Sequence, residues 1–120
     1  MSKKILAVDD SASMRQVVSL TLKEAGYDVV VACDGLEALE WARSGLVDLV
    51  LTDVHMPRMD GITLVRELRE LPNYKFVPML ILTTESSQEK KMDGKRAGAT
   101  GWLVKPFSPP QLLATVARVI

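Results

Sequence analysis

Five polar side chains of this sequence stand at the ends of short apolar runs, where a strand would stop. Asp9 and Asp10 follow "ILAV", Asp53 ends "VDLVLTD", Thr83 ends "MLILT" and Lys105 ends "GWLVK". Two adjacent carboxylates such as Asp9 and Asp10 repel each other unless a cation joins them. Three carboxylates, a hydroxyl and an ammonium would form one charged site if the fold brings these run ends together.

Carboxylates without a cluster of Cys or His favour a hard cation that prefers oxygen ligands. Mg²⁺ is the usual choice, because it takes one or two carboxylates and keeps waters and phosphate oxygens in its coordination shell. A carboxylate beside such a cation can act as a nucleophile toward a phosphoryl group and form an acyl phosphate. A lysine and a hydroxyl would orient the transferring oxygens. The residue types therefore indicate a metal-assisted phosphoryl acceptor or a phosphatase site.

Each of these residues, taken singly, has a simpler explanation. Asp10 precedes "SASM" and could cap a helix. Thr83 alone could belong to a capped turn, and Lys105 alone could be a solvated surface charge. The joint arrangement at the ends of successive runs is much less easily explained by chance, so we favour the functional interpretation.

Two alternating periodicities predict the elements that position these groups. Short aliphatic or β-branched runs, typical of strands covered on both faces, occupy residues 5–8, 29–32, 49–51, 79–82 and 102–104. Helical spacing separates them, and the predicted helix ends lie at Gly26, Gly45, Pro72 and Gly98. The first helix is expected to bury a face made of Met14, Val17, Val18, Thr21 and Ala25.

Alternation of five strands with five helices predicts an α/β sandwich. Its parallel sheet would have right-handed crossovers and helices on both faces. In sheets of this kind, ligands bind beyond the carboxyl ends of the strands. The polar side chains described above fall at those ends.

The composition excludes several classes of protein. The 120 residues, 48% hydrophobic and 25% charged, are typical of one globular domain spanning 1–120. Fifteen basic residues balance fifteen acidic ones, which argues against a nucleic-acid partner. No apolar stretch approaches the roughly 18 residues of a membrane span, and the single Cys33 fits a reducing compartment. We therefore expect a cytoplasmic monomer that binds neither nucleic acid nor membrane.

The motifs "VDD", "LTDVHMPRMDG", "ILTT" and "VKPF" resemble the receiver domains of two-component response regulators. The separations between Asp9, Asp53, Thr83 and Lys105 also agree with that family, and the likeness covers essentially the whole chain. This resemblance implies a flavodoxin-like (βα)5 sandwich whose parallel strands have the order 2-1-3-4-5.

The resemblance also implies roles for individual residues. Asp53 would accept a phosphoryl group from a phosphohistidine of a sensor histidine kinase. Asp9, Asp10, Asp53 and the backbone carbonyl of His55 would bind Mg²⁺. Lys105 would pair with the phosphoryl oxygens, and the Thr83 hydroxyl would move to hydrogen-bond them. The Lys105–Pro106 peptide is similar to one that is cis in the family.

Further positions of the resemblance concern switching and lifetime. Trp102 stands in the place of the switch aromatic, whose inward movement remodels the face formed by the fourth helix, fifth strand and fifth helix. His55, Thr84 and Glu85 occupy positions that tune hydrolysis of the acyl phosphate. The basic residues Lys90, Lys91, Lys95 and Arg96 lie on the fourth predicted helix, where they would favour an acidic partner.

The expected function is that of a stand-alone receiver, not an enzyme that turns over a substrate. The segments "DDSASMRQVVSLTLKEAGYDVVVACDGLEAL" and "GKRAGATGWLVKPF" look most like single-domain chemotaxis regulators. Those carry phosphoryl groups from a chemotaxis kinase to the flagellar motor switch, where they contact a switch protein, or drain the phosphoryl groups as a sink. A phosphatase is a further candidate partner. The alternatives are a receiver cut from a longer regulator or hybrid kinase and, ranked lower, a Mg²⁺-dependent aspartyl phosphatase.

Overall fold

The computed structural model describes residues 2–120. Its strands are β1 (Lys4–Val8), β2 (Asp28–Ala32), β3 (Leu49–Thr52), β4 (Met79–Thr83) and β5 (Gly101–Val104). They alternate with the helices α1 (Ala12–Glu24), α2 (Gly35–Ala42), α3 (Gly61–Arg69), α4 (Gln88–Ala97) and α5 (Pro109–Val119). A short 3-10 helix, η1 (Pro72–Tyr74), precedes β4. Within residues 2–120, no helix is long and apolar enough to cross a membrane.

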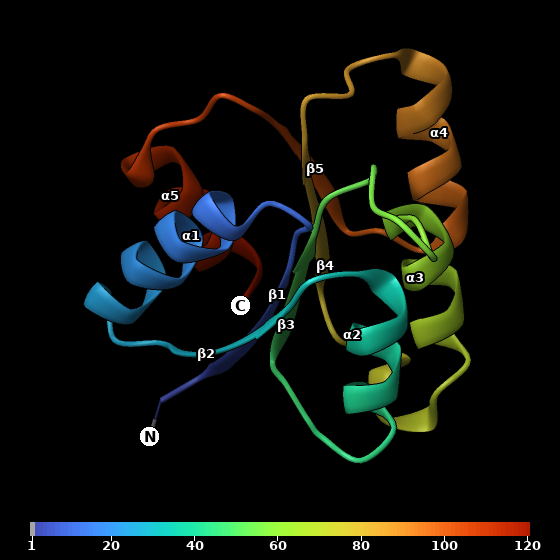
Figure 1. The fold of residues 1–120 in the computed structure, drawn as a ribbon, viewed down its shortest axis with the longest axis horizontal. Coiled ribbons are helices and arrows are strands. Elements are labelled where there is room, and N and C mark those ends of the chain that lie inside the picture. The colour runs from blue at the N-terminus through green and yellow to red at the C-terminus, as the bar shows by residue number, and fades with distance from the viewer. Residues whose placement is uncertain (1) are drawn as a thin grey trace.

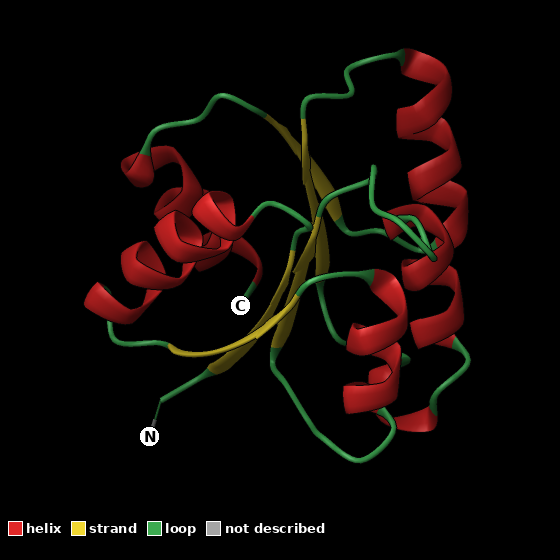
Figure 2. Ribbon diagram, in the orientation of Figure 1, coloured by secondary structure: helices red, strands yellow, loops and turns green. Residues whose placement is uncertain are grey.

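The strands form one parallel sheet in the order β2-β1-β3-β4-β5. Helices α1 and α5 cover one face, and α2, α3 and α4 cover the other (Figures 1 and 2). An apolar cluster fills the space on each side of the sheet. The strands β1, β3 and β4 are therefore buried on both faces, which explains their continuous apolar sequence. The predicted fold class and strand order are confirmed.

A capping side chain begins each of the five α-helices. The caps are Ser11, Asp34, Asp60, Ser87 and Ser108, each of which accepts a hydrogen bond from the backbone N–H three residues further on. Because Ser11 caps α1, helix capping does not explain the exposed carboxylate of Asp10. The simpler interpretation of that residue is therefore wrong.

The face of α1 that packs on the sheet differs from the prediction. Val18 and Leu22 are buried and Met14 is half-buried, whereas Val17 is 53% exposed. Residues four apart on a helix lie on one face. The stripe Met14–Val18–Leu22 therefore contacts the sheet, while Val17 turns to solvent and Ala25 is exposed as well.

Two predicted helix ends are also displaced. Helix α2 ends at Ala42, before Gly45, and α3 ends at Arg69, so that Pro72 begins the 3-10 helix instead of ending α3. The other two predicted ends are confirmed. Gly26 and Gly98 follow α1 and α4 with φ values of 97° and 113°, the left-handed conformation that favours glycine.

Candidate functional site

The polar groups predicted at the strand ends lie at one edge of the sheet. Asp9 and Asp10 follow β1, Asp53 follows β3, Thr83 is the last residue of β4, and Lys105 follows β5. All five strands are parallel, so their carboxyl ends meet at this edge. The strands β1 and β3 are direct neighbours, which brings the three aspartates together.

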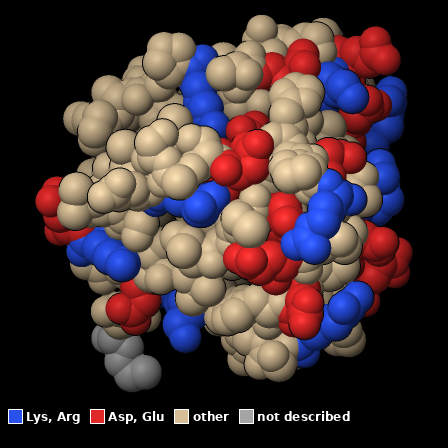
Figure 3. Space-filling view, in the orientation of Figure 1, with Lys and Arg blue, Asp and Glu red and all other residues tan. Residues whose placement is uncertain are grey.

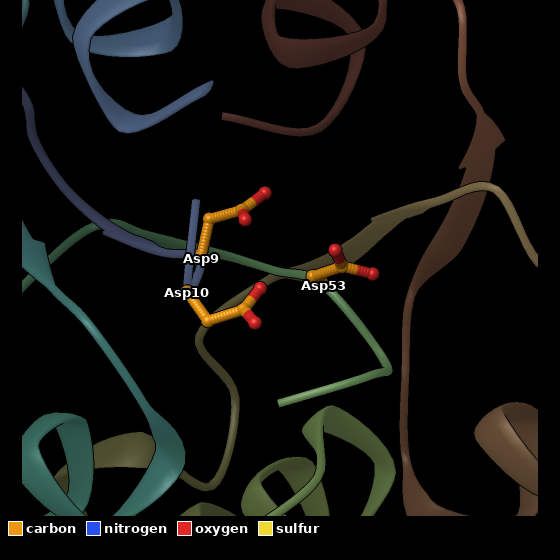
Figure 4. Close-up of side chains that lie close together, drawn as sticks. All are labelled: Asp9, Asp10 and Asp53. Atoms are coloured by element: carbon orange, nitrogen blue, oxygen red, sulfur yellow. The ribbon is translucent and has the colours of Figure 1, made fainter. Parts of the chain in front are cut away.

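Asp9, Asp10 and Asp53 form an acidic cluster. Each offers one carboxylate oxygen, and these oxygens lie within 4.8 Å of one another. Figure 4 shows that Asp9 and Asp10 project from the end of β1 toward the side on which Asp53 stands. Asp9 is buried, Asp53 is half-buried and Asp10 is exposed, so the cluster opens to solvent on one side. Such an oxygen-only donor set fits a hard cation that keeps part of its water shell.

The ammonium of Lys105 is the positive partner of this cluster. Its Nζ donates to Asp9 Oδ2 at 2.8 Å and to Asp53 Oδ2 at 3.1 Å, and none of the three side chains is more than 13% exposed. Burial opposes the charged ammonium, but the hydrogen bonds to Asp9 and Asp53 outweigh it and raise the pKa of Lys105 above its ordinary value. One firmly held positive charge therefore faces three carboxylates.

The backbone around Asp53 is fixed on several sides. Its N–H donates to the Val8 carbonyl at 3.0 Å, and its own carbonyl accepts from Thr52 Oγ1 at 2.9 Å. Its carboxylate Oδ1 accepts from the Val54 N–H at 2.6 Å. Gly61 approaches so closely that a Cβ there would overlap the Asp53 carbonyl oxygen. These contacts hold Asp53 with one carboxylate oxygen on Lys105 and the other on the Val54 amide.

Glu85 connects three of the other predicted residues. Its N–H donates to the hydroxyl of the buried Thr83 at 3.2 Å, and its carbonyl accepts from the Trp102 indole at 3.0 Å. Its carboxylate Oε1 lies 3.2 Å from His55 Nε2. Hydrogen bonds from Ser87 and then from His55 lower the pKa of Glu85. The imidazole of His55 thus faces Glu85 and is not among the side chains that make up the acidic cluster.

The indole of Trp102 packs against α4 at a glycine. A Cβ at Gly94 would come within 2.9 Å of the indole ring, so the glycine makes room for this large side chain. Trp102 is half-buried, while Thr84 in the preceding loop is exposed. A hollow of about 300 Å³ beside the indole is lined by Lys91, Lys95, Ala99, Thr100, Gly101 and Trp102. The predicted Lys105–Pro106 cis peptide is present.

Sequence reasoning missed three features next to the site. The guanidinium of Arg15 donates to the Asp9 carbonyl at 2.7 Å from α1. Gly61 packs on Asp53, and Arg58 contacts the cap residue Asp34. The "DG" that ends "PRMDG" indicates a turn but not which backbone the glycine must approach. The contacts of Arg15 and Arg58 leave no signal in residue type or spacing.

Comparison with solved structures extends these observations. The structure of the chemotaxis protein CheY4 from Vibrio cholerae matches with a TM-score of 0.97 at 54% identity, and the match covers all of both chains. The receiver domain of the sensor histidine kinase PA1611 from Pseudomonas aeruginosa matches with a TM-score of 0.92 at 30% identity, over 99% of this chain and 98% of that one. That structure has a magnesium ion coordinated in its active site cleft.

Sequence comparison agrees with the structural matches. The profile of the response regulator receiver domain matches residues 5–117. The Bacillus subtilis regulator of alkaline phosphatase synthesis, PhoP, is 38% identical over the whole chain, which spans 49% of PhoP. The chemotaxis protein CheY-3 of Vibrio cholerae is 39% identical over 97% of this chain and 90% of its own length. The chain thus spans about half the length of several curated relatives and nearly all of others.

Proposed function

The chain belongs to the response regulator receiver domain family, and we propose that Asp53 accepts a phosphoryl group from a sensor histidine kinase. The observation that carries this proposal is the sharing of Lys105 between Asp53 and Asp9, with Asp10 beside them. Asp9, Asp10, Asp53 and the backbone carbonyl of His55 would hold a Mg²⁺ ion. When bound, this ion would supply positive charge for the phosphoryl oxygens.

The proposed transfer uses the residues in the following way. A carboxylate oxygen of Asp53 attacks phosphorus while the bond from phosphorus to the kinase imidazole nitrogen breaks. The electron pair of that bond stays on the imidazole, which takes up a proton. Lys105 stays charged and pairs with the phosphoryl oxygens. Each chain is phosphorylated once, and the acyl phosphate on Asp53 is later hydrolysed. We therefore propose that the chain is a phosphoacceptor and not an enzyme that turns over a substrate.

Signalling in this proposal starts from the Thr83 hydroxyl. It would turn from the Glu85 N–H toward the phosphoryl group, and this movement would remove one of the hydrogen bonds that hold the Glu85 backbone. The carbonyl of the same residue holds the Trp102 indole. Added charge at Asp53 would therefore bias the arrangement of Trp102 and α4. His55, Thr84 and Glu85 border this path and would set the lifetime of the acyl phosphate.

Mg²⁺ is expected to raise the melting temperature of the protein. Three carboxylates and one ammonium leave excess negative charge at the site, and a cation that binds only the folded chain stabilises it by mass action. The gain should be about 1–3 kcal/mol when the ion is present at tens of times its Kd. The difference between the melting temperatures in millimolar Mg²⁺ and in NaCl of equal ionic strength measures this gain in stability. Asp10→Asn should reduce the gain, and equal melting temperatures for the wild type in both salts would contradict the proposed metal site.

We further propose that the phosphorylated chain acts in chemotaxis, where it would contact a flagellar motor switch protein. Support comes from the chemotaxis proteins that this chain matches along nearly their whole length. The contact surface would be the hollow beside Trp102, whose lysines Lys91 and Lys95 suit an acidic segment of a partner. On the face shown in Figure 3, acidic and basic side chains are interspersed. The proposed place of action is the cytoplasm.

Partner capture tests this output role. The chain, with and without beryllofluoride as a phosphoryl mimic, is used to bind proteins from a lysate of the source cells. Enrichment of a flagellar switch protein with beryllofluoride is expected, and Lys91→Glu combined with Lys95→Glu should remove it. Capture without any dependence on beryllofluoride would contradict a phosphorylation-controlled output.

Two other roles remain compatible with the same site. Several relatives are about twice as long as this chain, so a receiver that works within a longer regulator is one alternative. A phosphate sink is the other, and it would accept phosphoryl groups without gaining a partner. An aspartyl phosphatase ranks lower and differs in kinetics, because it would hydrolyse small phosphate esters over many turnovers.

A further inference from the structure

An ion pair links the loop after Asp53 to the start of α2. Arg58 reaches Asp34 Oδ2 with two nitrogens, Nε at 2.8 Å and Nη2 at 2.6 Å. The other carboxylate oxygen, Oδ1, accepts from the Glu37 N–H at 2.9 Å and caps α2. Asp34 is only 4% exposed, although more than half of the Arg58 side chain is exposed. A buried carboxylate on a helix end therefore anchors a residue of the neighbouring loop.

The backbone of this loop is unusual at the anchored residue. Arg58 has a φ of 66°, and within residues 2–120 it is the only non-glycine residue with a positive φ. This left-handed conformation is unfavourable for a residue with a Cβ, so it persists where surrounding contacts impose it. The next residue is also held, since a Cβ at Gly35 would come within 2.7 Å of the Met59 carbonyl oxygen. The start of α2 thus fixes two consecutive residues of the loop.

The residues between Asp53 and Arg58 have few hydrogen bonds of their own. In residues 2–120, the backbone groups of His55 and Met56 take part in no hydrogen bond with other protein groups. The nearest backbone bonds are Met59 N–H to the Pro57 carbonyl at 2.7 Å and Gly61 N–H to the Val54 carbonyl at 2.9 Å. The course of the backbone at His55 therefore depends on contacts made by side chains and by neighbouring residues. The His55 side chain itself contacts Glu85, and Arg58 provides the next polar side-chain anchor along the chain, on the side of α2.

We propose that the Asp34–Arg58 ion pair is a positioning device for the cation site: it sets the loop that carries the backbone carbonyl of His55. This inference rests on the proposed function, in which that carbonyl is a Mg²⁺ ligand. Neither residue belongs to the acidic cluster or to the other proposed ligands of the ion. Both act through the loop, as outer residues commonly do at metal sites.

Two variants that change the charge in opposite directions distinguish a positioning role of the ion pair from a direct electrostatic effect on the cation. Arg58→Gln removes a positive charge, which by Coulomb attraction alone would strengthen cation binding. Asp34→Asn removes a negative charge, which alone would weaken it. Asparagine still caps α2 but presents an amide N–H₂ group in place of the oxygen that Arg58 contacts. If the pair positions the loop, both variants should weaken Mg²⁺ binding, by roughly tenfold.

Isothermal titration of the complete chain with Mg²⁺ alone tests this proposal. Asp34→Asn and Arg58→Gln are each expected to raise the Mg²⁺ Kd by roughly tenfold, and the double variant should be no worse than either single one. Arg58→Gly favours the left-handed backbone but does not supply the ion pair, so its Mg²⁺ binding should also be weaker than that of the wild type. Arg66→Gln and Asp60→Asn are matched charge controls on α3 and at its cap, and both should bind like the wild type. Melts without metal check that each variant is folded.

Each outcome bears on a different claim. Tighter binding by Arg58→Gln with weaker binding by Asp34→Asn would show through-space electrostatics and overturn the positioning role. Wild-type affinity in Arg58→Gly would also overturn it, because the backbone turn alone would then suffice. Absence of Mg²⁺ binding by the wild type itself would instead contradict the proposed function.

Discussion

Replacing Asp53 with Asn is expected to abolish acyl phosphate formation. The wild-type carboxylate is held with Oδ2 on Lys105 and Oδ1 on the Val54 amide, and an oxygen of this group is the proposed nucleophile. Asparagine keeps the shape of the side chain but lacks the anionic oxygen. Incubation with a small phosphodonor such as acetyl phosphate plus Mg²⁺, followed by intact-protein mass spectrometry, should show no added phosphoryl group on the variant.

A matched control lies in the same loop. Asp60 caps α3 through the Thr63 N–H at 2.8 Å and does not belong to the acidic cluster. Asp60→Asn removes the same charge and retains a capping side chain. This variant should still be labelled, and labelling of Asp53→Asn to the wild-type level would refute the assignment of the phosphoacceptor.

Gly61→Ala is expected to cost both stability and phosphorylation. The added methyl group would overlap the carbonyl oxygen of Asp53, and this oxygen is backbone that cannot rotate away. Removing this overlap requires either β3 or α3 to shift, which should lower the free energy of unfolding by roughly 3 kcal/mol or more. The melting temperature should fall by about 10 °C or more. Acyl phosphate formation should fall even at temperatures at which the variant is folded, because Asp53 is displaced.

Gly26→Ala provides the comparison for this second substitution. Gly26 has a φ of 97° but no atom within 4 Å of an added Cβ. Its replacement should therefore lower the free energy of unfolding by only about 1 kcal/mol, because alanine disfavours the left-handed backbone. Labelling of Asp53 should be unaffected. Equal losses of stability in the two variants would contradict a steric role for Gly61. Thermal melts and the phosphodonor assay on both variants decide the matter.

Much of the fold and the site could be predicted because both depend on regular features of the chain. Continuous apolar runs predicted the five strands to within one residue at each end. The signal is strongest for β1, β3 and β4, because strands buried on both faces have no exposed side that polar residues could occupy. In a parallel sheet, the residue after each strand lies at one common edge. Asp9, Asp53 and Lys105 were therefore expected to meet, and the structure joins them through two ion pairs.

The remaining features depend on three-dimensional contacts that periodicity does not encode. Val17 and Val18 are equally apolar, so only packing against the sheet shows that Val18 is the buried one. The contact of Arg58 with Asp34 requires a left-handed backbone at Arg58, which its residue type does not favour. Likewise, the room that Gly94 provides for Trp102 depends on how α4 lies against β5.

Chemical trapping of the modified residue tests the central claim most directly. The wild-type chain is treated with a small phosphodonor, with and without Mg²⁺, then reduced with borohydride, which converts an aspartyl phosphate to homoserine, and analysed by peptide mass spectrometry. Conversion is expected at Asp53 alone and only when Mg²⁺ is present. Conversion at Asp9 or Asp10 instead, or equal conversion of Asp53 without metal, would contradict that claim.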